Sequence, residues 1–262
     1  MPIGRDISFS EHRSLTYITT LAAMMGPMSS LPEPPAPPQR RARQARRRAL
    51  DRETIVDAAI RILDSDGLDG VTLRRVAEEL GASAASLYDY VESKDVLVEL
   101  MLDRVIGEID LSDLPDSRPW QDQIKDLIRR TRTAFASHGD IARATLGHIP
   151  SGQNALQEME VMLAVLRRSE LSDQVIAYAG DLIGLLAGAS AYEDSLFAQT
   201  GVGFDEFLRY IHEFRTYLES LPADRFPNLV ALAGPLTRTN PDEDERFEFM
   251  LNVLVDGLAA QP

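Results

Sequence analysis

The densest chemical signal in this sequence is a run of arginines near its start. Residues 40–48 read RRARQARRR, which places six arginines in nine positions. Guanidinium groups at that density bind most favourably where negative charge is equally dense, as it is along the phosphates of a nucleic acid. The alternative is a solvated arm that contacts nothing, and the run alone does not decide between the two.

Small side chains follow Gly81. Ser83 is the predicted N-cap of a short helix, and the first turn of that helix is formed by Ala84, Ala85 and Ser86. Side chains this short let a helix approach the base edges and thymine methyl groups of a major groove closely. This segment is therefore a candidate for contacting DNA, provided that neighbouring helices present it outward.

Larger polar side chains lie on both sides of this turn. Tyr88 and Tyr90 carry hydroxyls that can reach phosphates. Lys94, one of only two lysines in the chain, stands at a predicted helix N-terminus, where backbone amides already favour a phosphate. Arg74 and Arg75 begin the preceding helix, close to where a duplex would lie. The alternative for the tyrosines is that they seal a small core, and for Arg75 that it is merely exposed.

The hydrophobic spacing predicts the helices that position these groups. Apolar residues at 55, 59 and 62 mark one face of a first helix, which we expect to end at Asp64–Gly67, where glycine can take a left-handed conformation. Two short helices follow, over 72–80 and 84–90, and a long helix begins after position 93. Two short helices joined by a glycine turn form a helix-turn-helix, whose second helix enters a major groove. The predicted N-caps of the four helices are Asp51, Thr72, Ser83 and Ser93.

Beyond Pro115 the periodic segments are helical, and the sequence shows no alternating strand pattern. Helices are predicted over 119–137, 140–148, 154–168, 172–199, 204–220 and 242–259, with a break at the proline-containing stretch 221–241. The predicted fold is all-α, with an N-terminal three-helix helix-turn-helix domain joined to a larger helical domain. The predicted domains are a disordered Pro- and Arg-rich extension at 1–49, the helix-turn-helix domain at 50–96 and the larger helical domain at 97–262.

Charge is distributed unevenly between these parts. Residues 1–96 carry 13 Lys and Arg and 14 Asp and Glu, whereas 97–262 carry 14 and 27, so nearly all of the net charge of −14 belongs to the C-terminal part. The chain has no cysteine, which excludes disulfides and thiolate metal sites. It also lacks the glycine-rich phosphate loop, the nucleophile elbow and the HExxH helix of common enzymes. We therefore expect no enzyme and no cofactor.

Residues 15–25 form a short apolar stretch near the start of the chain. The stretch is too short to span a bilayer as a helix, and no small-residue cleavage site follows it. An alternative is that translation begins at Met24, Met25 or Met28 rather than at Met1. We expect a cytoplasmic protein with no membrane partner.

The segment Leu80 to Leu97, LGASAASLYDYVESKDVL, resembles the DNA-binding signature of TetR-type transcriptional regulators, and the match extends over Thr54–Met101. The resemblance implies that double-stranded DNA is contacted by the positions matching Arg74, Ala84, Ala85, Ser86, Tyr88 and Lys94. Together with the reasoning above, the predicted DNA contacts are Arg48, Thr72, Arg74, Arg75, Ser83, Ala84, Ala85, Ser86, Tyr88, Tyr90 and Lys94. The arginine run then gains a role, because an arm just before the first helix can reach a neighbouring minor groove.

The C-terminal part is similar to the tetracycline-repressor subgroup of that family. The similarity rests on LDR at 102–104, WQD at 120–122, SHGD at 137–140, LGHIP at 146–150, YED at 192–194 and FEFMLNVLVDGL near the end. It implies a helical pocket for a small-molecule effector and a homodimer built by the last two long helices. A two-fold dimer suits DNA because two recognition helices then meet successive major grooves of a near-palindromic operator.

Two helix faces support a dimer separately from the resemblance. Gly180, Gly184 and Gly188 recur every four residues and give one helix a smooth face, at a cost of roughly 1 kcal/mol each. The final helix carries an apolar stripe made of Phe247, Met250, Leu251, Leu254 and Leu258. The alternative is that both faces pack within a single chain.

The predicted effector site departs from that of the tetracycline repressor. There, a histidine near the LGxxP motif helps to ligate the magnesium carried by the drug, whereas the aligned position here is Thr145 and His148 lies three residues further on. Glu193 matches an acidic residue of the metal shell, but one carboxylate is poor evidence for a hard cation. We predict a mostly apolar effector and no metal; His148 is either a ligand contact or a satisfied core histidine. The predicted site comprises Ile106, Leu127, Thr131, Thr145, His148, Val161 and Glu193.

These features predict a ligand-responsive DNA-binding transcriptional regulator, a repressor in the family's usual sense, that a small and mostly apolar effector releases from its operator. The alternative is a DNA-binding regulator or architectural protein with no small-molecule ligand. An internal cavity in the helical domain would favour the first over the second.

Overall fold

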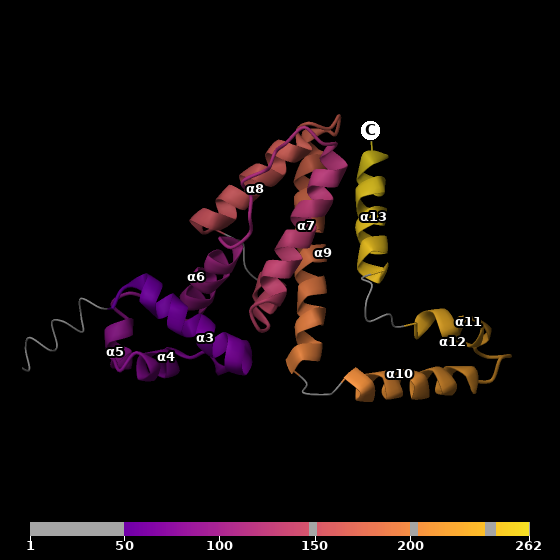
Figure 1. Cartoon of the computed structure of the whole chain (residues 1–262), viewed down its shortest axis with the longest axis horizontal. Coiled ribbons are helices and arrows are strands. Elements are labelled where there is room, and N and C mark those ends of the chain that lie inside the picture. The colour runs from indigo at the N-terminus through magenta and orange to yellow at the C-terminus, as the bar shows by residue number, and fades with distance from the viewer. Residues whose placement is uncertain (1–49, 147–150, 200–203, 239–244, 262) are drawn as a thin grey trace, which may run out of the picture. The chain divides into compact units, whose positions relative to one another are not determined.

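The computed structural model of the chain describes residues 50–146, 151–199, 204–238 and 245–261 (Figure 1). Throughout these ranges the regular secondary structure is helical, so the predicted all-α fold is confirmed. The arginine run and the predicted contacts Arg48 and His148 lie outside the described residues.

Four helices form the N-terminal part, namely α3 (Arg52–Gly70), α4 (Leu73–Glu79), α5 (Ala84–Leu87) and α6 (Lys94–Ile106). Each begins after its predicted N-cap, whose side-chain oxygen accepts a hydrogen bond from a backbone amide three residues further on. The distance is 2.8 Å at Asp51 and 3.2 Å at Thr72, Ser83 and Ser93. Caps of this kind stabilise a helix by about 1 kcal/mol each, so the sequence determines where these helices start.

Two helix ends differ from the predictions. α5 ends at Leu87 rather than near Tyr90, because the amides of Tyr90 and Val91 both donate to the Leu87 carbonyl at 2.9 Å and close a turn there. Gly67 has the positive φ that we predicted, 70°, but its ψ of 176° is extended rather than left-handed helical. The chain therefore continues past Gly67 into a further short turn that ends at Gly70.

A small aliphatic core holds these four helices together. Ile55 and Leu63 of α3, Val76 of α4, Leu87 of α5 and Leu97 of α6 are all fully buried. A buried aliphatic side chain of this size contributes about 1.5–3 kcal/mol relative to an exposed one. This core fixes the inner faces of α4 and α5 and leaves their other faces toward solvent.

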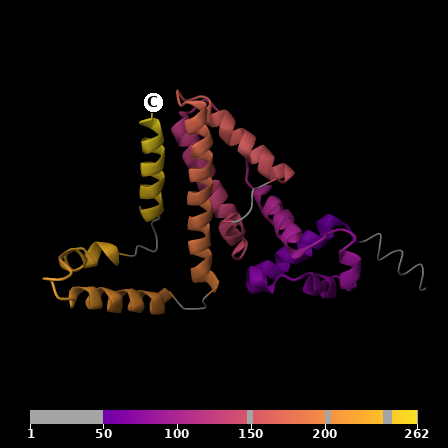
Figure 2. The same ribbon diagram turned by 180° about the vertical axis from the view of Figure 1, so that it is seen from behind.

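The larger part of the chain is built around α7 (Trp120–Ala136) and α9 (Asp173–Gln199), which lie side by side (Figures 1 and 2). α13 (Glu245–Ala259) packs against both of them, and α8 (Gln153–Leu166) packs against α6, α7 and α9. The segment predicted as a helix over 140–148 is, in its described portion, a 3-10 helix (Ile141–Leu146) that packs mainly against α9.

The stretch predicted as a break contains two short helices, α11 (Pro227–Ala231) and α12 (Ala233–Leu236). Both pack against α10 (Phe204–Glu219). Along α10 the rings of Tyr210 and Phe214 stack with their centroids 6.3 Å apart. Proline at the first position of α11 is compatible with a helix, because that residue needs no amide donor there.

Three residues of the apolar stripe predicted to join two copies through the final helix face inward instead. Phe247, Leu251 and Leu258 are buried, and the guanidinium of Arg132 on α7 lies 4.2 Å from the centre of the Phe247 ring. The prediction of a dimer contact is therefore wrong for these three residues, because they pack within one chain, while Met250 and Leu254 are half-buried. The exposed apolar side chains of α13 are on its other side, at Phe249 and Val253.

The glycines of α9 also lie mostly against the same chain. A Cβ on Gly188 would come within 2.5 Å of the Thr145 hydroxyl, and one on Gly180 would lie 3.2 Å from the Met162 methyl, whereas Gly184 faces open space. α9 is long and apolar enough to cross a membrane over Asp173–Leu196, with a mean hydropathy of 1.4. Its inward side packs on neighbouring helices, and its other side is exposed.

Candidate DNA-binding surface and effector site

One side of α4 and α5 is turned to solvent. The Arg74 side chain is 82% exposed and pairs with Glu78 one turn further along, at 3.1 Å. Tyr88 is 54% exposed, and Ala85 between them is exposed as well. A guanidinium and a phenol hydroxyl around a patch of short side chains suit a surface on which phosphates are contacted at the edges and bases at the centre. We call this the α4–α5 surface.

Arg75 and Lys94 are engaged within the protein. Arg75 Nη2 lies 2.5 Å from Asp66 Oδ2, and this hydrogen bond is the main reason why the pKa of Asp66 is lowered. Lys94 Nζ donates to the Leu68 carbonyl at 3.1 Å. Both cations therefore hold the turn between α3 and α4, and their contact with phosphates stays a prediction.

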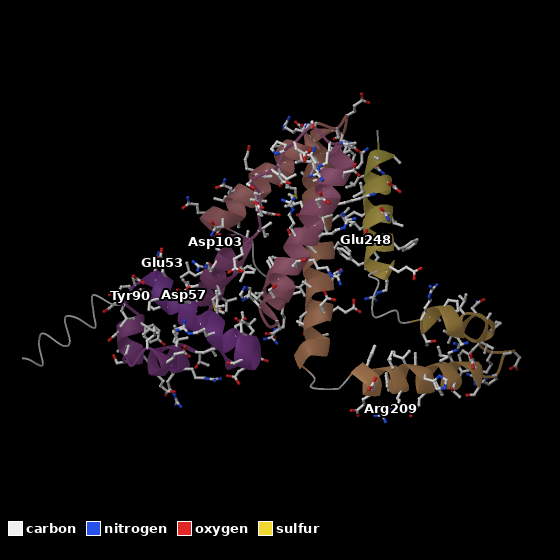
Figure 3. All side chains as sticks on the ribbon, in the orientation of Figure 1. Glu53, Asp57, Tyr90, Asp103, Arg209 and Glu248 are labelled. Atoms are coloured by element: carbon white, nitrogen blue, oxygen red, sulfur yellow. The ribbon has the colours of Figure 1, made fainter. Side chains whose placement is uncertain are left out.

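Three further predicted DNA contacts, Thr72, Ser83 and Tyr90, also stabilise the fold. Thr72 and Ser83 are exposed N-caps. Tyr90, labelled in Figure 3, packs partly against the core, and its backbone carbonyl accepts a hydrogen bond from Arg52 Nε at 3.1 Å. For Tyr90 the core interpretation is thus compatible with the structure, while Tyr88 has the exposure that a DNA contact requires.

The helix-turn-helix is tied to the larger part through contacts that sequence reasoning missed. The buried Asp140 accepts a hydrogen bond from the Leu68 amide at 2.5 Å, and Arg143 pairs with Asp69 at 2.5 Å. Gly139 immediately precedes Asp140 and has a φ of 47°, and a Cβ on it would come within 2.7 Å of the backbone oxygen of Leu63 in α3. The backbone of α3 at Leu63 and the backbone just after α7 therefore approach each other closely.

A histidine strengthens the same junction. His138 Nδ1 lies 3.1 Å from Asp64 Oδ1, and its Nε2 lies 2.9 Å from Glu108 Oε2. Burial of the imidazole opposes protonation, but the hydrogen bonds and charges of Glu108 and Asp64 outweigh it, so the pKa of His138 is raised. The junction cluster is defined as Asp64, Leu68, Asp69, Glu108, His138, Asp140 and Arg143. In the sequence, the only sign of this cluster was the SHGD motif at 137–140, which indicated similarity to the tetracycline-repressor subgroup but gave no structural role to these residues.

Four of the predicted effector residues lie on helices that pack against one another. Ile106 of α6 and Leu127 of α7 are buried, and Val161 of α8 is partly buried. Thr131 of α7 is 9% exposed, and its hydroxyl donates to the Leu127 carbonyl at 3.0 Å. The walls that these residues provide are therefore mostly apolar. Their contact with an effector stays a prediction.

Two polar members of the predicted site are occupied by internal contacts. The Thr145 hydroxyl donates to the Ala142 carbonyl at 2.8 Å. The Glu193 carboxylate on α9 forms an ion pair with the Arg246 guanidinium of α13. Across the described residues, no group of three or more His, Asp and Glu side chains is arranged to hold a metal ion.

A pocket of about 280 Å³ lies elsewhere in the larger part. It is lined by residues such as Trp120 at the start of α7, Arg168 after α8 and Gln261 after α13. None of the predicted effector residues that the structure describes lines this pocket. The pocket is therefore separate from the described part of the predicted effector site.

Comparison with known proteins identifies the family to which these two domains are similar. The family model described as bacterial regulatory proteins of the tetR family matches residues 55–101, and that of the tetracyclin repressor-like C-terminal domain matches residues 114–261. The transcriptional repressor DrrR1 of Streptomyces coeruleorubidus is 33% identical over 214 residues, which cover 80% of this chain and 76% of DrrR1. The class A tetracycline repressor from transposon 1721, in Escherichia coli, is 26% identical over 211 residues, covering 80% and 91%.

Solved structures show the same relationship. ActR of Streptomyces coelicolor in complex with actinorhodin has a TM-score of 0.72 and 38% identity, covering 80% of this chain and 96% of ActR. A TetR of Acinetobacter baumannii in complex with minocycline has a TM-score of 0.58 at 21% identity over 79% and 96% of the two chains, and it shows the shared fold alone.

The helix-turn-helix and the helical domain behind it therefore define a DNA-binding transcriptional regulator. The chain belongs to the TetR family, with a C-terminal domain of the tetracycline-repressor-like type. Regulators of this family bind DNA operators as dimers and respond to small-molecule effectors. They are generally not enzymes. The family and the class of function predicted from the sequence are confirmed.

Proposed function

We propose that this chain is a repressor whose α4–α5 surface binds a near-palindromic operator, and whose helical domain causes release when a small, mostly apolar effector binds. The observation that carries the proposal is the exposure of Arg74 and Tyr88 around short side chains, on helices fixed by the fully buried core beneath them. A rigid element with an outward cationic and small-residue face is what direct contact with a major groove requires.

The continuous helix α6 supplies the path from effector to DNA. It begins at Lys94 inside the helix-turn-helix and ends at Ile106, one of the predicted effector residues. A ligand shifts DNA affinity only by its differential affinity for two arrangements of the protein. Repacking around Ile106 changes the direction of α6. The junction cluster attaches the helix-turn-helix domain to the larger domain at a second place, so both attachments shift together.

The effector is proposed to lie between α6, α7 and α8. Ile106, Leu127 and Val161 offer apolar walls there, and Thr131 adds one hydroxyl. The related ActR is known in complex with actinorhodin and with (S)-DNPA, which supports a small-molecule site in this type of domain. Glu193, paired with Arg246, has no need of a metal ion to neutralise it.

The proposal also includes the location of the protein, its lack of catalytic activity and its domain boundaries. The protein acts in the cytoplasm and catalyses no reaction. The helix-turn-helix domain covers 50–96, the effector and dimerisation domain covers 97–262, and 1–49 is an extension that adds phosphate contacts. The proposed boundary at residue 96 falls within α6, so that helix belongs to both domains.

Selection of genomic fragments by the purified full-length protein tests the DNA half of the proposal. Recovered fragments are expected to share two half-sites related by an inverted repeat, with centres about 34–36 Å or a multiple apart. Failure to enrich any fragment over bulk DNA at physiological salt would contradict the proposal.

A thermal-shift screen of small molecules, followed by operator-release assays, tests the effector half. Hits are expected to raise the melting temperature, because a ligand that binds the folded state stabilises it by mass action, and to lower operator affinity. A protein that binds its operator tightly but responds to no molecule would instead favour a regulator without a ligand.

A further inference from the structure

α8 carries a carboxylate on its inward face. The buried side chains of α8 include Ala155, Met162 and Val165, which are spaced seven and three residues apart. Glu158 follows Ala155 by three residues and so lies on the same face of the helix. The side chain of Glu158 is itself partly buried. Residues at this spacing share one face of a helix, so Glu158 is directed to the side on which α8 packs against α6, α7 and α9.

Two contacts locate Glu158 along α8. Near the start of the helix, the Ala155 amide donates to Asp103 of α6 at 2.9 Å (Asp103 is labelled in Figure 3). One turn beyond Glu158, the Met162 methyl lies 3.2 Å from where a Cβ on Gly180 of α9 would be. Glu158 therefore lies between the α6 contact and the α9 contact, on the helix that also carries the predicted effector residue Val161.

Glu158 differs from the carboxylates that link neighbouring helices in this domain. Asp103, Asp194 and Glu248 each accept hydrogen bonds from a neighbouring helix. No described residue is seen to form a hydrogen bond or ion pair with Glu158, and burial alone raises its pKa to about 7. A carboxylate that is partly withdrawn from water and has no partner in the chain is costly to the fold. Such a group is suited to a partner that comes from outside the chain.

The surroundings of Glu158 favour a cationic partner. Residues 97–262 carry 14 Lys and Arg against 27 Asp and Glu, so the domain as a whole attracts cations. The predicted walls at Ile106 and Leu127 are apolar and buried. We propose that Glu158 binds a basic nitrogen of the effector, while the rest of the effector contacts apolar side chains of α6 and α7. This inference rests on the proposed function, because it requires an effector in the helical domain.

A matched pair of probes tests the proposal on the purified full-length protein. 1-(Aminomethyl)naphthalene carries an ammonium group on an apolar ring system, and 1-(hydroxymethyl)naphthalene replaces it with a neutral hydroxyl. Calorimetric titration is expected to show the amine binding at least about tenfold more tightly than the alcohol, as for charge pairs withdrawn from water. Glu158→Gln should remove that preference and leave the affinity for the alcohol unchanged.

Glu160→Gln is the control, because Glu160 is an exposed carboxylate on the same helix. It should keep the preference for the amine. Glu158→Gln also removes a charge that has no partner, so its melting temperature is expected to equal or exceed that of the wild type, which checks that the variant is folded. The same titrations are repeated with operator DNA present.

The outcomes separate this inference from the proposed function. Equal binding of the two probes by the wild type, no binding of the amine, or an amine preference that survives Glu158→Gln would overturn the role of Glu158. Operator release by some other molecule would still support a ligand-responsive repressor. Amine binding that depends on Glu158 but leaves operator affinity unchanged would support the site and contradict its regulatory use.

Discussion

Arg74 and Arg75 are neighbours in the sequence with different surroundings. Arg74 extends into solvent and pairs with Glu78 of its own helix, whereas Arg75 reaches back to Asp66 of α3. Exposed ion pairs within one helix contribute little to stability. Arg74 is therefore available to a phosphate at small cost, while Arg75 is already used by the fold.

Arg74→Ala is expected to weaken operator binding about tenfold and to lower the slope of log affinity against log salt by about 1, as for a lost phosphate contact. The free energy of unfolding should stay within about 0.5 kcal/mol of the wild type. Fluorescence anisotropy titrations at several salt concentrations measure both binding quantities. Arg167→Ala removes an exposed arginine remote from the α4–α5 surface. An equal loss of affinity in that control would show a general charge effect instead.

Gly139→Ala is expected to destabilise the protein by at least about 1–3 kcal/mol, since alanine is strained at positive φ. Its Cβ would also press on the Leu63 carbonyl, 2.7 Å away. Urea unfolding measures the change. Gly234→Ala, whose Cβ would make only ordinary contact with the Arg215 side chain, should be neutral or slightly stabilising. Comparable stability of the two variants would contradict the close approach at Gly139.

At the scale of elements, local chemistry accounts for most of what the sequence could predict. The side chains of Asp51, Thr72, Ser83 and Ser93 each cap a helix through a hydrogen bond to an amide only three residues further on. Because such caps are local in sequence, these helix starts were predicted correctly. The junction cluster was missed because its partners lie up to 74 residues apart, and no spacing rule connects them.

The direction of helix faces was harder to predict than their position. The stripe at Phe247 was found, but its partner was assigned wrongly, since an apolar face looks the same whether it meets its own chain or another. Glu158 was missed because the sequence does not show which helices surround it. A single glutamate on a helix has no distinctive pattern until the neighbouring helices are in place around it.

The junction cluster should make stability depend on pH through His138. Because its pKa is raised in the folded state above the ordinary 6.5, the protonated imidazole favours folding. The stabilisation is fully present below about pH 6.5 and is lost as pH rises through the folded-state pKa. The difference in unfolding free energy between wild type and His138→Gln is therefore expected to be largest near pH 6 and to shrink toward pH 9.

Urea unfolding at a series of pH values measures this difference. His212→Gln replaces an exposed histidine of α10 and should follow the wild type throughout. A difference for His138→Gln that is constant with pH would show that the imidazole acts through packing alone.

For the whole molecule, the exposed apolar side chains indicate where two copies meet. Tyr178, Leu182 and Leu185 lie on one face of α9, and Phe249 and Val253 lie on the outer side of α13, which packs against α9. A monomer rarely leaves a continuous apolar patch in water. The dimer that the family forms is thus expected to use these side chains, and not the inward stripes that the sequence first suggested.

Leu185→Glu should convert the dimer to monomer and reduce operator affinity by more than about 100-fold, because each half-site contact is then made alone. Sedimentation velocity measures the association state and anisotropy measures the affinity. Leu156→Glu changes a similarly exposed leucine on α8 and should leave the dimer intact. A Leu185→Glu protein that remains dimeric would place the interface elsewhere.

Deleting residues 1–48 removes the arginine run and tests the predicted arm. Operator affinity is expected to fall and its salt dependence to flatten, since fewer counterions are released, while the preferred sequence stays the same. An unchanged salt slope in the truncated protein would show that the arm contacts no phosphates. Selection of fragments with both proteins compares their preferred sequences.

The shared helix α6 has a mechanical consequence. Its 13 residues extend about 20 Å at 1.5 Å per residue. A tilt of roughly 10° at the Ile106 end would carry the Lys94 end sideways by about 3.5 Å, on the scale at which packed elements switch position. Two such displacements, related by the dimer axis, would change the distance between the two recognition helices by about 7 Å, so that they no longer match two successive major grooves about 34–36 Å apart.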